Sequence, residues 1–147
     1  MIRTALACLL LLSTAARADE CDTLVGQIAQ AIGAKKIGKR VGPSVDVKAA
    51  SGLKIDVTCR AEPIVQVASS EPSPSAAYYR DLSIAGGLAI GVPPATVEAA
   101  LVRAYETALR ERRKSFIQQS GWSASCYADP GSSSLRTLCS VGRIPPG

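Results

Sequence analysis

The sequence predicts an α+β domain, in which three helices cover one face of an antiparallel sheet of four or five strands and two disulfides staple the fold. Three observations lead to this class. Four segments alternate apolar and polar residues with the period of a β-strand. Three others have helical composition or spacing, and an even number of cysteines follows an export signal. The expected order is α-β-β-(β)-α-α-β-β, with the strands forming two hairpins.

Residues 1–18 have the three parts of a secretory signal peptide: basic Arg3, an apolar stretch from Ala5 to Leu12, and a small-residue end at Ala16-Arg17-Ala18. The apolar stretch is about half of the roughly 20 residues that a membrane span needs. An uncleaved helix is the alternative, whereas lipidation of Cys8 is disfavoured because the apolar segment mostly follows that cysteine. We expect cleavage near Ala18, which leaves one domain over 19–147. The mature protein is expected to be periplasmic or secreted and to have no transmembrane span.

The composition excludes several kinds of chemistry. The 147 residues include 17 Lys and Arg, 12 Asp and Glu, five Cys and no His. Loss of residues 1–18 removes two arginines and one cysteine, which leaves a net charge of 15 − 12 = +3 and four cysteines. Without histidine, the commonest general base and most zinc sites are missing. We therefore expect no metal, no cofactor and a role other than catalysis.

A hairpin near the C-terminus predicts one disulfide. Alternating residues run from Trp122 to Ala128 and again from Leu135 to Val141, around a turn rich in Gly, Pro and Ser. A hairpin centred between positions 132 and 133 pairs residues whose numbers sum to 265, and 126 + 139 = 265. Cys126 and Cys139 then face each other at a separation that a disulfide can bridge.

The remaining cysteines, Cys21 and Cys59, form the second predicted disulfide. Four cysteines permit three pairings, and four free thiols are the alternative, which oxidising compartments rarely allow. No Cys-x-x-Cys occurs, so a thioredoxin-like redox role is not indicated. We expect both disulfides to be structural.

The N-terminal half begins with a helix and continues as strands. Helical spacing of apolar residues runs from Cys21 to Ile32 and Gly33 ends it, after which residues 34–42 read as a basic loop or fraying helix end. Alternation over 45–49 and 53–60 around Ser51-Gly52 predicts a hairpin. Residues 64–68 add a third strand, which Pro63 marks as an edge strand.

The middle of the chain is predicted to be helical. Residues 69–75 form a surface crossover, and a helix from Ala76 to Ile90 follows, with Gly86-Gly87 allowing close packing. A longer helix from Ala95 to Gln119 is expected, with Thr96 as its cap and a basic C-terminal third beside the negative end of the helix dipole. Its apolar stripe comprises Val97, Leu101, Tyr105, Ala108 and Leu109. Trp122 and one of Tyr78 and Tyr79 are expected in the core, the alternative being a ligand groove.

Two basic clusters are the candidate surface for an anionic partner. The residues are Lys35, Lys36, Lys39, Arg40, Arg110, Arg112, Arg113 and Lys114. Such clusters suit a protein or an anionic envelope component. Solvated segments that bind nothing are the plainer interpretation. We do not expect nucleic acid as a partner, because an exported protein rarely meets it and no aromatic residues alternate with these cations as stacking platforms would require. The sequence leaves the oligomeric state open.

The leading hypothesis is therefore a non-catalytic, exported, disulfide-stapled binding domain. The first alternative is a secreted inhibitor or effector-like module, in which Glu71-Pro72-Ser73-Pro74 or Asp129-Pro130-Gly131-Ser132 enters a target's cleft. The second is a small hydrolase with a serine nucleophile and no histidine, although the chain has no Gly-x-Ser-x-Gly.

Overall fold

The computed structural model describes residues 20–145, so the predicted signal peptide lies outside the described residues. A helix covers residues 20–31. The elements that follow are β1 (Lys36–Ile37), β2 (Ser44–Lys48), β3 (Lys54–Thr58), β4 (Ile64–Ser69), α2 (Ala76–Ile90), α3 (Pro94–Glu111), β5 (Ser115–Gln119), β6 (Trp122–Ala128) and β7 (Thr137–Arg143). The α+β class is confirmed, as are three helices and an antiparallel sheet. The sheet has seven strands rather than four or five, and the element order differs in detail.

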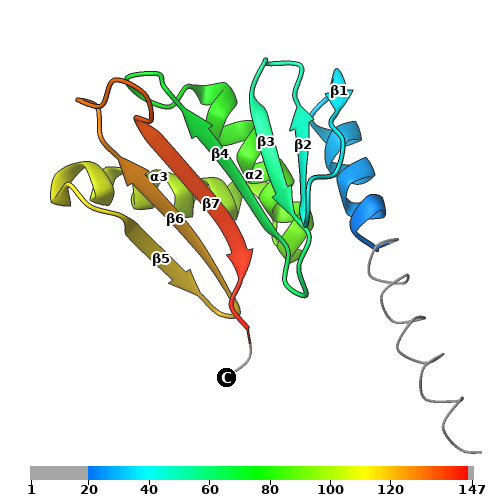
Figure 1. Cartoon of the computed structure of the whole chain (residues 1–147). Coiled ribbons are helices and arrows are strands. Elements are labelled where there is room, and N and C mark those ends of the chain that lie inside the picture. Colours follow the sequence, from blue (N-terminus) through cyan, green and yellow to red (C-terminus); the bar gives the residue numbers. More distant parts are fainter. Residues whose placement is uncertain (1–19, 146–147) are drawn as a thin grey trace, which may run out of the picture.

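The strands form one antiparallel sheet in the order β1-β2-β3-β4-β7-β6-β5. The two halves of the chain meet where β4 pairs with β7, so strands from opposite halves of the sequence are neighbours at the centre of the sheet. The helices lie behind one face of the sheet (Figure 1), with α2 against β4 and β7 and α3 against β5 and β6.

The core lies between this face and the helices because the strands alternate as their sequences predict. Val47, Ile55, Val57, Val65, Val67 and Val141 are fully buried on the helix side. Trp122 is also buried, which confirms it as a core residue. The opposite face carries mainly polar and charged side chains such as Asp46, Asp56 and Gln66, and on it Ser125 and Ser140 share a hydrogen bond of 2.8 Å between their hydroxyl oxygens.

The hairpin formed by β2 and β3 is confirmed, with Asp46 opposite Asp56. Two predictions about its surroundings are wrong. The basic segment 34–42 contains the two-residue strand β1, which pairs with β2. β4 is a central strand rather than an edge strand, because Pro63 precedes its first residue, Ile64, and therefore removes no donor from the ladder.

Helix α2 has the predicted bounds, and its ends have clear causes. The side chain of Ser75 accepts a hydrogen bond from the backbone N–H of Tyr78 at 3.1 Å, and Gly91 ends the helix with φ 72°. Gly86 allows the close packing that was expected: a Cβ there would lie 2.9 Å from Cβ of Val141. The helix therefore approaches β7 more closely than any residue with a side chain would permit.

Tyr78 connects α2 with both central strands. Its hydroxyl donates a hydrogen bond to the carbonyl oxygen of Val67 at 2.7 Å and accepts one from the backbone N–H of Cys139 at 3.0 Å. Burial raises the pKa of Tyr78 well above that of a free tyrosine, so the phenol stays protonated and can donate. Tyr79, by contrast, is half-buried, as expected for its neighbour on a helix.

The prediction of one helix from Ala95 to Gln119 is wrong. α3 begins at Pro94, so Thr96 is not its cap, and it ends at Glu111, because Arg112 adopts a left-handed conformation with φ 52°. The chain then reverses and forms β5 against β6. Pairing with β6 overrides the helical propensity of the basic segment. The predicted apolar stripe is buried except for Leu109, which is exposed.

Candidate binding surface at one end of the sheet

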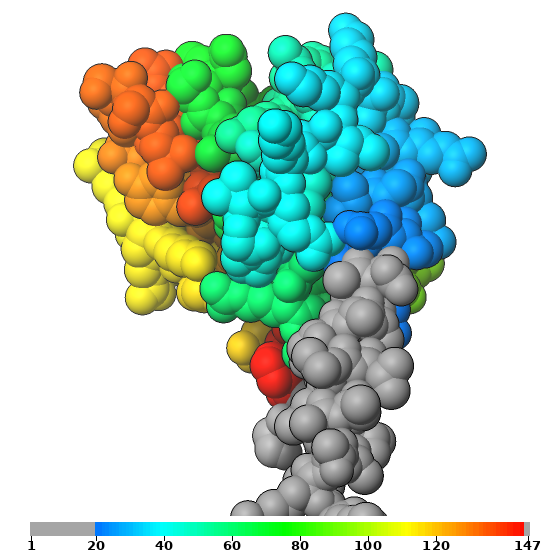
Figure 2. Space-filling model, turned by 45° about the vertical axis from the view of Figure 1, so that its right-hand side comes forward, coloured from blue at the N-terminus to red at the C-terminus, as the bar shows by residue number. Residues whose placement is uncertain are grey.

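Three segments that are distant in the sequence meet at one end of the sheet. β4 ends at Ser69, which pairs with Thr137 at the start of β7, and Thr137 also pairs with Ala128 at the end of β6. β5 starts at the same end, with Ser115 opposite Cys126. Loops 70–75 and 129–136 consequently lie side by side, and both views show this (Figures 1 and 2). We call this end, with loops 70–75 and 129–136 and the connection 112–114, the loop end.

Loop 129–136 is held in shape by its own hydrogen bonds. The backbone N–H of Asp129 donates to the carbonyl oxygen of Arg136 at 2.8 Å, and Nε of Arg136 donates to the carbonyl oxygen of Ser132 at 2.8 Å. The Asp129 carboxylate accepts from the N–H of Gly131 at 3.2 Å. The N–H of Arg136 donates to the carbonyl oxygen of Ser69 at 2.9 Å, which ties the loop to β4. The loop is therefore preformed.

A disulfide fixes the two strands that carry this loop. Cys126 and Cys139 are paired as predicted, with their Cα atoms 4.1 Å apart and both residues fully buried. This close approach is typical of an antiparallel pair that exchanges no hydrogen bonds. The second predicted disulfide, Cys21 to Cys59, is also present, with its Cα atoms 5.8 Å apart. Both cysteine pairings are thus confirmed.

A small pocket of about 480 Å³ lies between the end of α3 and loop 129–136. Leu109, Arg112, Tyr127, Asp129 and Pro130 line it, so apolar, cationic and anionic groups meet there. The Tyr127 hydroxyl donates to the Asp129 carboxylate at 3.3 Å. Desolvation and then the Asp129 charge raise the pKa of Tyr127, which keeps this phenol a donor.

The basic cluster at residues 110–114, which we call the basic corner, borders the same pocket. It has four cations and one carboxylate, Glu111, which pairs with Arg113 at 2.6 Å. Nζ of Lys114 lies 4.9 Å from the ring centroid of Phe116. Since Arg113 is mostly exposed, its ion pair contributes little to stability, and the corner as a whole keeps a positive field.

The other predicted basic cluster lies at the opposite edge of the sheet. Lys36 belongs to β1, while the basic corner adjoins β5, and these are the two edge strands. Arg40 forms an ion pair with Asp22. The eight predicted cations therefore do not form one surface, because sequence proximity within each cluster says nothing about the distance between the clusters.

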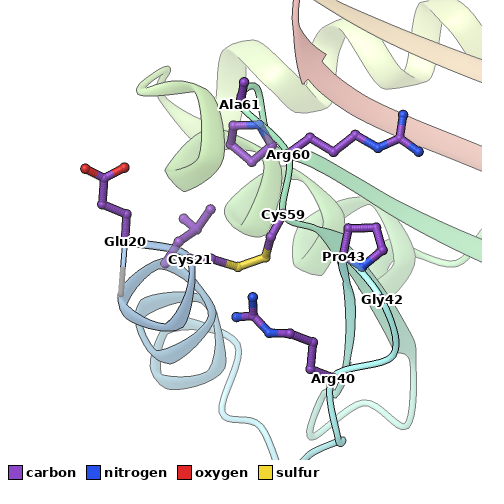
Figure 3. Close-up of a pocket in the computed structure, with 10 residues that line it drawn as sticks. Glu20, Cys21, Arg40, Gly42, Pro43, Cys59, Arg60 and Ala61 are labelled. Atoms are coloured by element: carbon purple, nitrogen blue, oxygen red, sulfur yellow. A yellow bond between two sulfur atoms is a disulfide. The ribbon is translucent and has the colours of Figure 1, made fainter. Parts of the chain in front are cut away.

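A hollow of about 720 Å³ surrounds the Cys21–Cys59 disulfide (Figure 3). Its lining includes Glu20, Arg40 and Arg60, yet these charged side chains diverge: Arg40 reaches toward the disulfide, whereas Glu20 and Arg60 point away from it. A ligand site needs polar groups that converge on one point. The hollow is therefore a weaker candidate than the loop end.

One spacing of catalytic interest escaped the sequence analysis: Ser51 and Lys54 stand in the Ser-x-x-Lys pattern of some serine hydrolases. The Ser51 hydroxyl donates to the buried Asp81 carboxylate at 2.5 Å, and Nζ of Lys54 pairs with Asp46 at 3.2 Å. Each side chain thus has a carboxylate partner of its own. The bond to Asp81 fastens the β2–β3 turn to α2. Within residues 20–145, no three His, Cys, Asp or Glu side chains group as metal ligands would.

Comparisons of the chain with protein-family models, with curated proteins and with solved structures give no match. Within the described part of the chain, no single helix has both the length and the hydropathy to cross a bilayer. α2 and α3 reach those values only together, across a bend of 118°.

Proposed function

We propose that the protein is an exported, non-catalytic binding module that holds a partner protein at its loop end. The observation that carries this proposal is the preformed loop 129–136, which hydrogen bonds and the Cys126–Cys139 disulfide fix beside the basic corner. A loop that is already ordered loses little conformational entropy on binding.

The charge of the loop end indicates the partner's chemistry. The basic corner offers four cations against one carboxylate on an exposed surface, which favours a partner with an acidic surface. Such charges mainly raise the association rate and select among partners. An anionic envelope polymer would meet the same field, but it would have no use for the fixed shape of loop 129–136.

Export is supported by the features of residues 1–18 and by the two disulfides, since stable disulfides belong mainly to oxidising compartments. A second candidate function, that of an inhibitor, is favoured by the exposed turn at Asp129, Pro130 and Gly131, which would enter the cleft of a target enzyme as a rigid plug. The serine-hydrolase alternative is the least supported, because Ser51 and Lys54 bond different carboxylates.

Affinity capture from an envelope extract of the source organism tests the proposal. The variant Arg112→Glu, Arg113→Glu, Lys114→Glu is expected to lose the partner. The control Lys35→Glu, Lys36→Glu, Lys39→Glu makes the same change in net charge at the other edge and is expected to retain it. Equal capture by the two variants would contradict the assignment to the loop end. Labelling of a serine by a serine-reactive probe would support the hydrolase instead.

A further inference from the structure

β5 is an edge strand with unused backbone hydrogen-bonding groups. It is last in the sheet order and, within residues 20–145, pairs with β6 alone. Gln119 and Trp122 close a two-residue turn and therefore form a hydrogen-bonded pair. Because the pattern alternates along the strand, Phe116 and Gln118 direct their N–H and C=O groups away from β6. These four groups face the free edge of the sheet.

This edge lacks the usual protection against a further strand. Residues 115–119 include no charge and no proline, and Phe116 is 57% exposed on the face opposite the helices. The other edge differs: β1 is two residues long, and one of them is Lys36. Proteins normally shorten or charge an edge strand in this way, because an open edge accepts another strand. β5 is thus the edge that is available for pairing.

The basic corner indicates which kind of strand would pair with β5. Residues 112–114 directly precede β5, so an added antiparallel strand would bring its C-terminal part next to them. A second copy of this chain would bring residues 119–121 of its own β5 hairpin to that position, and these carry no carboxylate. Charge complementarity therefore favours a different chain with acidic residues.

We propose that β5 is a strand-addition site for an extended segment of a partner protein that carries acidic residues at its C-terminal end. Backbone bonds at Phe116 and Gln118 would supply affinity, and the basic corner would set the direction of the segment. This inference rests on the proposed function only in taking the partner to be a protein.

The test is fluorescence anisotropy with two labelled peptides and the exported, disulfide-bonded protein. The first is Thr-Val-Thr-Val-Thr-Glu-Asp-Glu, and the second carries the same residues with the acidic run at the N-terminus. We expect the first to bind more tightly. The variant Gln118→Pro, which removes an outward donor without removing a β5–β6 bond, is expected to weaken binding about tenfold. Its matched control Gln118→Thr keeps the N–H group and should bind as the wild type does.

Hydrogen exchange provides a readout that does not depend on the proline variant folding. With peptide at millimolar concentration, the amides of Phe116 and Gln118 should gain protection. No saturable binding, binding that Gln118→Pro leaves unchanged, or no added protection at these two amides would each overturn the proposal. If the protein instead forms a dimer in the absence of peptide, and Gln118→Pro disrupts that dimer, β5 pairs with a second copy of the chain and the proposal is overturned. If the peptides fail to bind but the variant Arg112→Glu, Arg113→Glu, Lys114→Glu still loses the partner in affinity capture, the strand-addition proposal is wrong and the proposed function stands.

Discussion

The two halves of the molecule have a similar order of secondary-structure elements, but their disulfides and the edges of their sheet strands differ. In each half a helix precedes consecutive antiparallel strands: the helix over 20–31 comes before the short β1 and then β2, β3 and β4, and α3 comes before β5, β6 and β7. The last strands of the two halves, β4 and β7, pair at the centre of the sheet. Tyr78 joins them, because its hydroxyl bonds one backbone group on each.

The disulfides differ in what they connect. Cys21–Cys59 ties the helix of the first half to the residue that follows β3, whereas Cys126–Cys139 ties two strands of the second half to each other. The first half is also closed at its edge by β1, while the second has the open edge β5 and the long loop 129–136. The first half is thus closed at its edge, whereas the second half carries both surfaces at which we propose that a partner binds.

Reduction of the disulfides is expected to show the largest difference between the two halves. Cys59 is partly exposed in the wall of the hollow, whereas Cys126 and Cys139 are fully buried. We expect Cys21–Cys59 to be reduced about a hundredfold faster, since reaching the buried pair requires an opening that costs about 3 kcal/mol more. Differential alkylation and mass spectrometry measure both rates. Equal rates would mean that the second half opens as readily as the first.

Removing each disulfide tests how much each half depends on it. The separations of 38 and 13 residues give expected losses of about 4 kcal/mol for Cys21→Ala, Cys59→Ala and about 3 kcal/mol for Cys126→Ala, Cys139→Ala, from loop closure alone. Urea denaturation of the two double variants measures the losses. The reverse order would show that packing around the buried cysteines outweighs loop closure.

Tyr78→Phe tests the contact between the halves, where the Tyr78 hydroxyl bonds both β4 and β7. The change leaves a buried carbonyl on Val67 and a buried N–H on Cys139 without the hydroxyl that bonds both, and we expect a loss of about 2 kcal/mol in the free energy of unfolding. Tyr79→Phe is the matched control, because Tyr79 is half-buried, and it should change stability by less than about 0.5 kcal/mol. Urea denaturation measures both, and similar values would remove the special role of Tyr78.

Thr137→Val is expected to have the smallest effect and to be stabilising. Its buried hydroxyl has no hydrogen-bond partner within residues 20–145, so an isosteric valine should raise the free energy of unfolding by about 1 kcal/mol. Thr58→Val is the control in the first half and should destabilise, because the Thr58 hydroxyl donates to Asp56 at 2.9 Å. A thermal melt of each variant decides the sign, and destabilisation by Thr137→Val would contradict the prediction.

The parts of the fold that local patterns encode were predictable. The alternation around Cys126 and Cys139 predicted their register, and Gly86 predicted a close approach of helix and sheet. Residues 112–119 were not predictable in the same way, because a short segment with Phe116 and Ile117 suits either a helix or a strand until β6 is present beside it. The two loops and the basic residues near position 112 were each singled out from the sequence, but their meeting at one end of the sheet was not, because these segments are 15 to 66 positions apart in the chain.

By itself, the sequence determined the α+β class, the three helices, both cysteine pairings and the face that each alternating strand would bury. Periodicity and cysteine spacing are properties of neighbouring residues, so one chain is enough to show them. Only the tertiary structure decided that β4 is central, that the two basic clusters lie at opposite edges and that β5 leaves one edge open. Each of these features depends on which strands pair with each other. That pairing is determined by burial of the whole apolar face of the sheet rather than by the preference of any local segment.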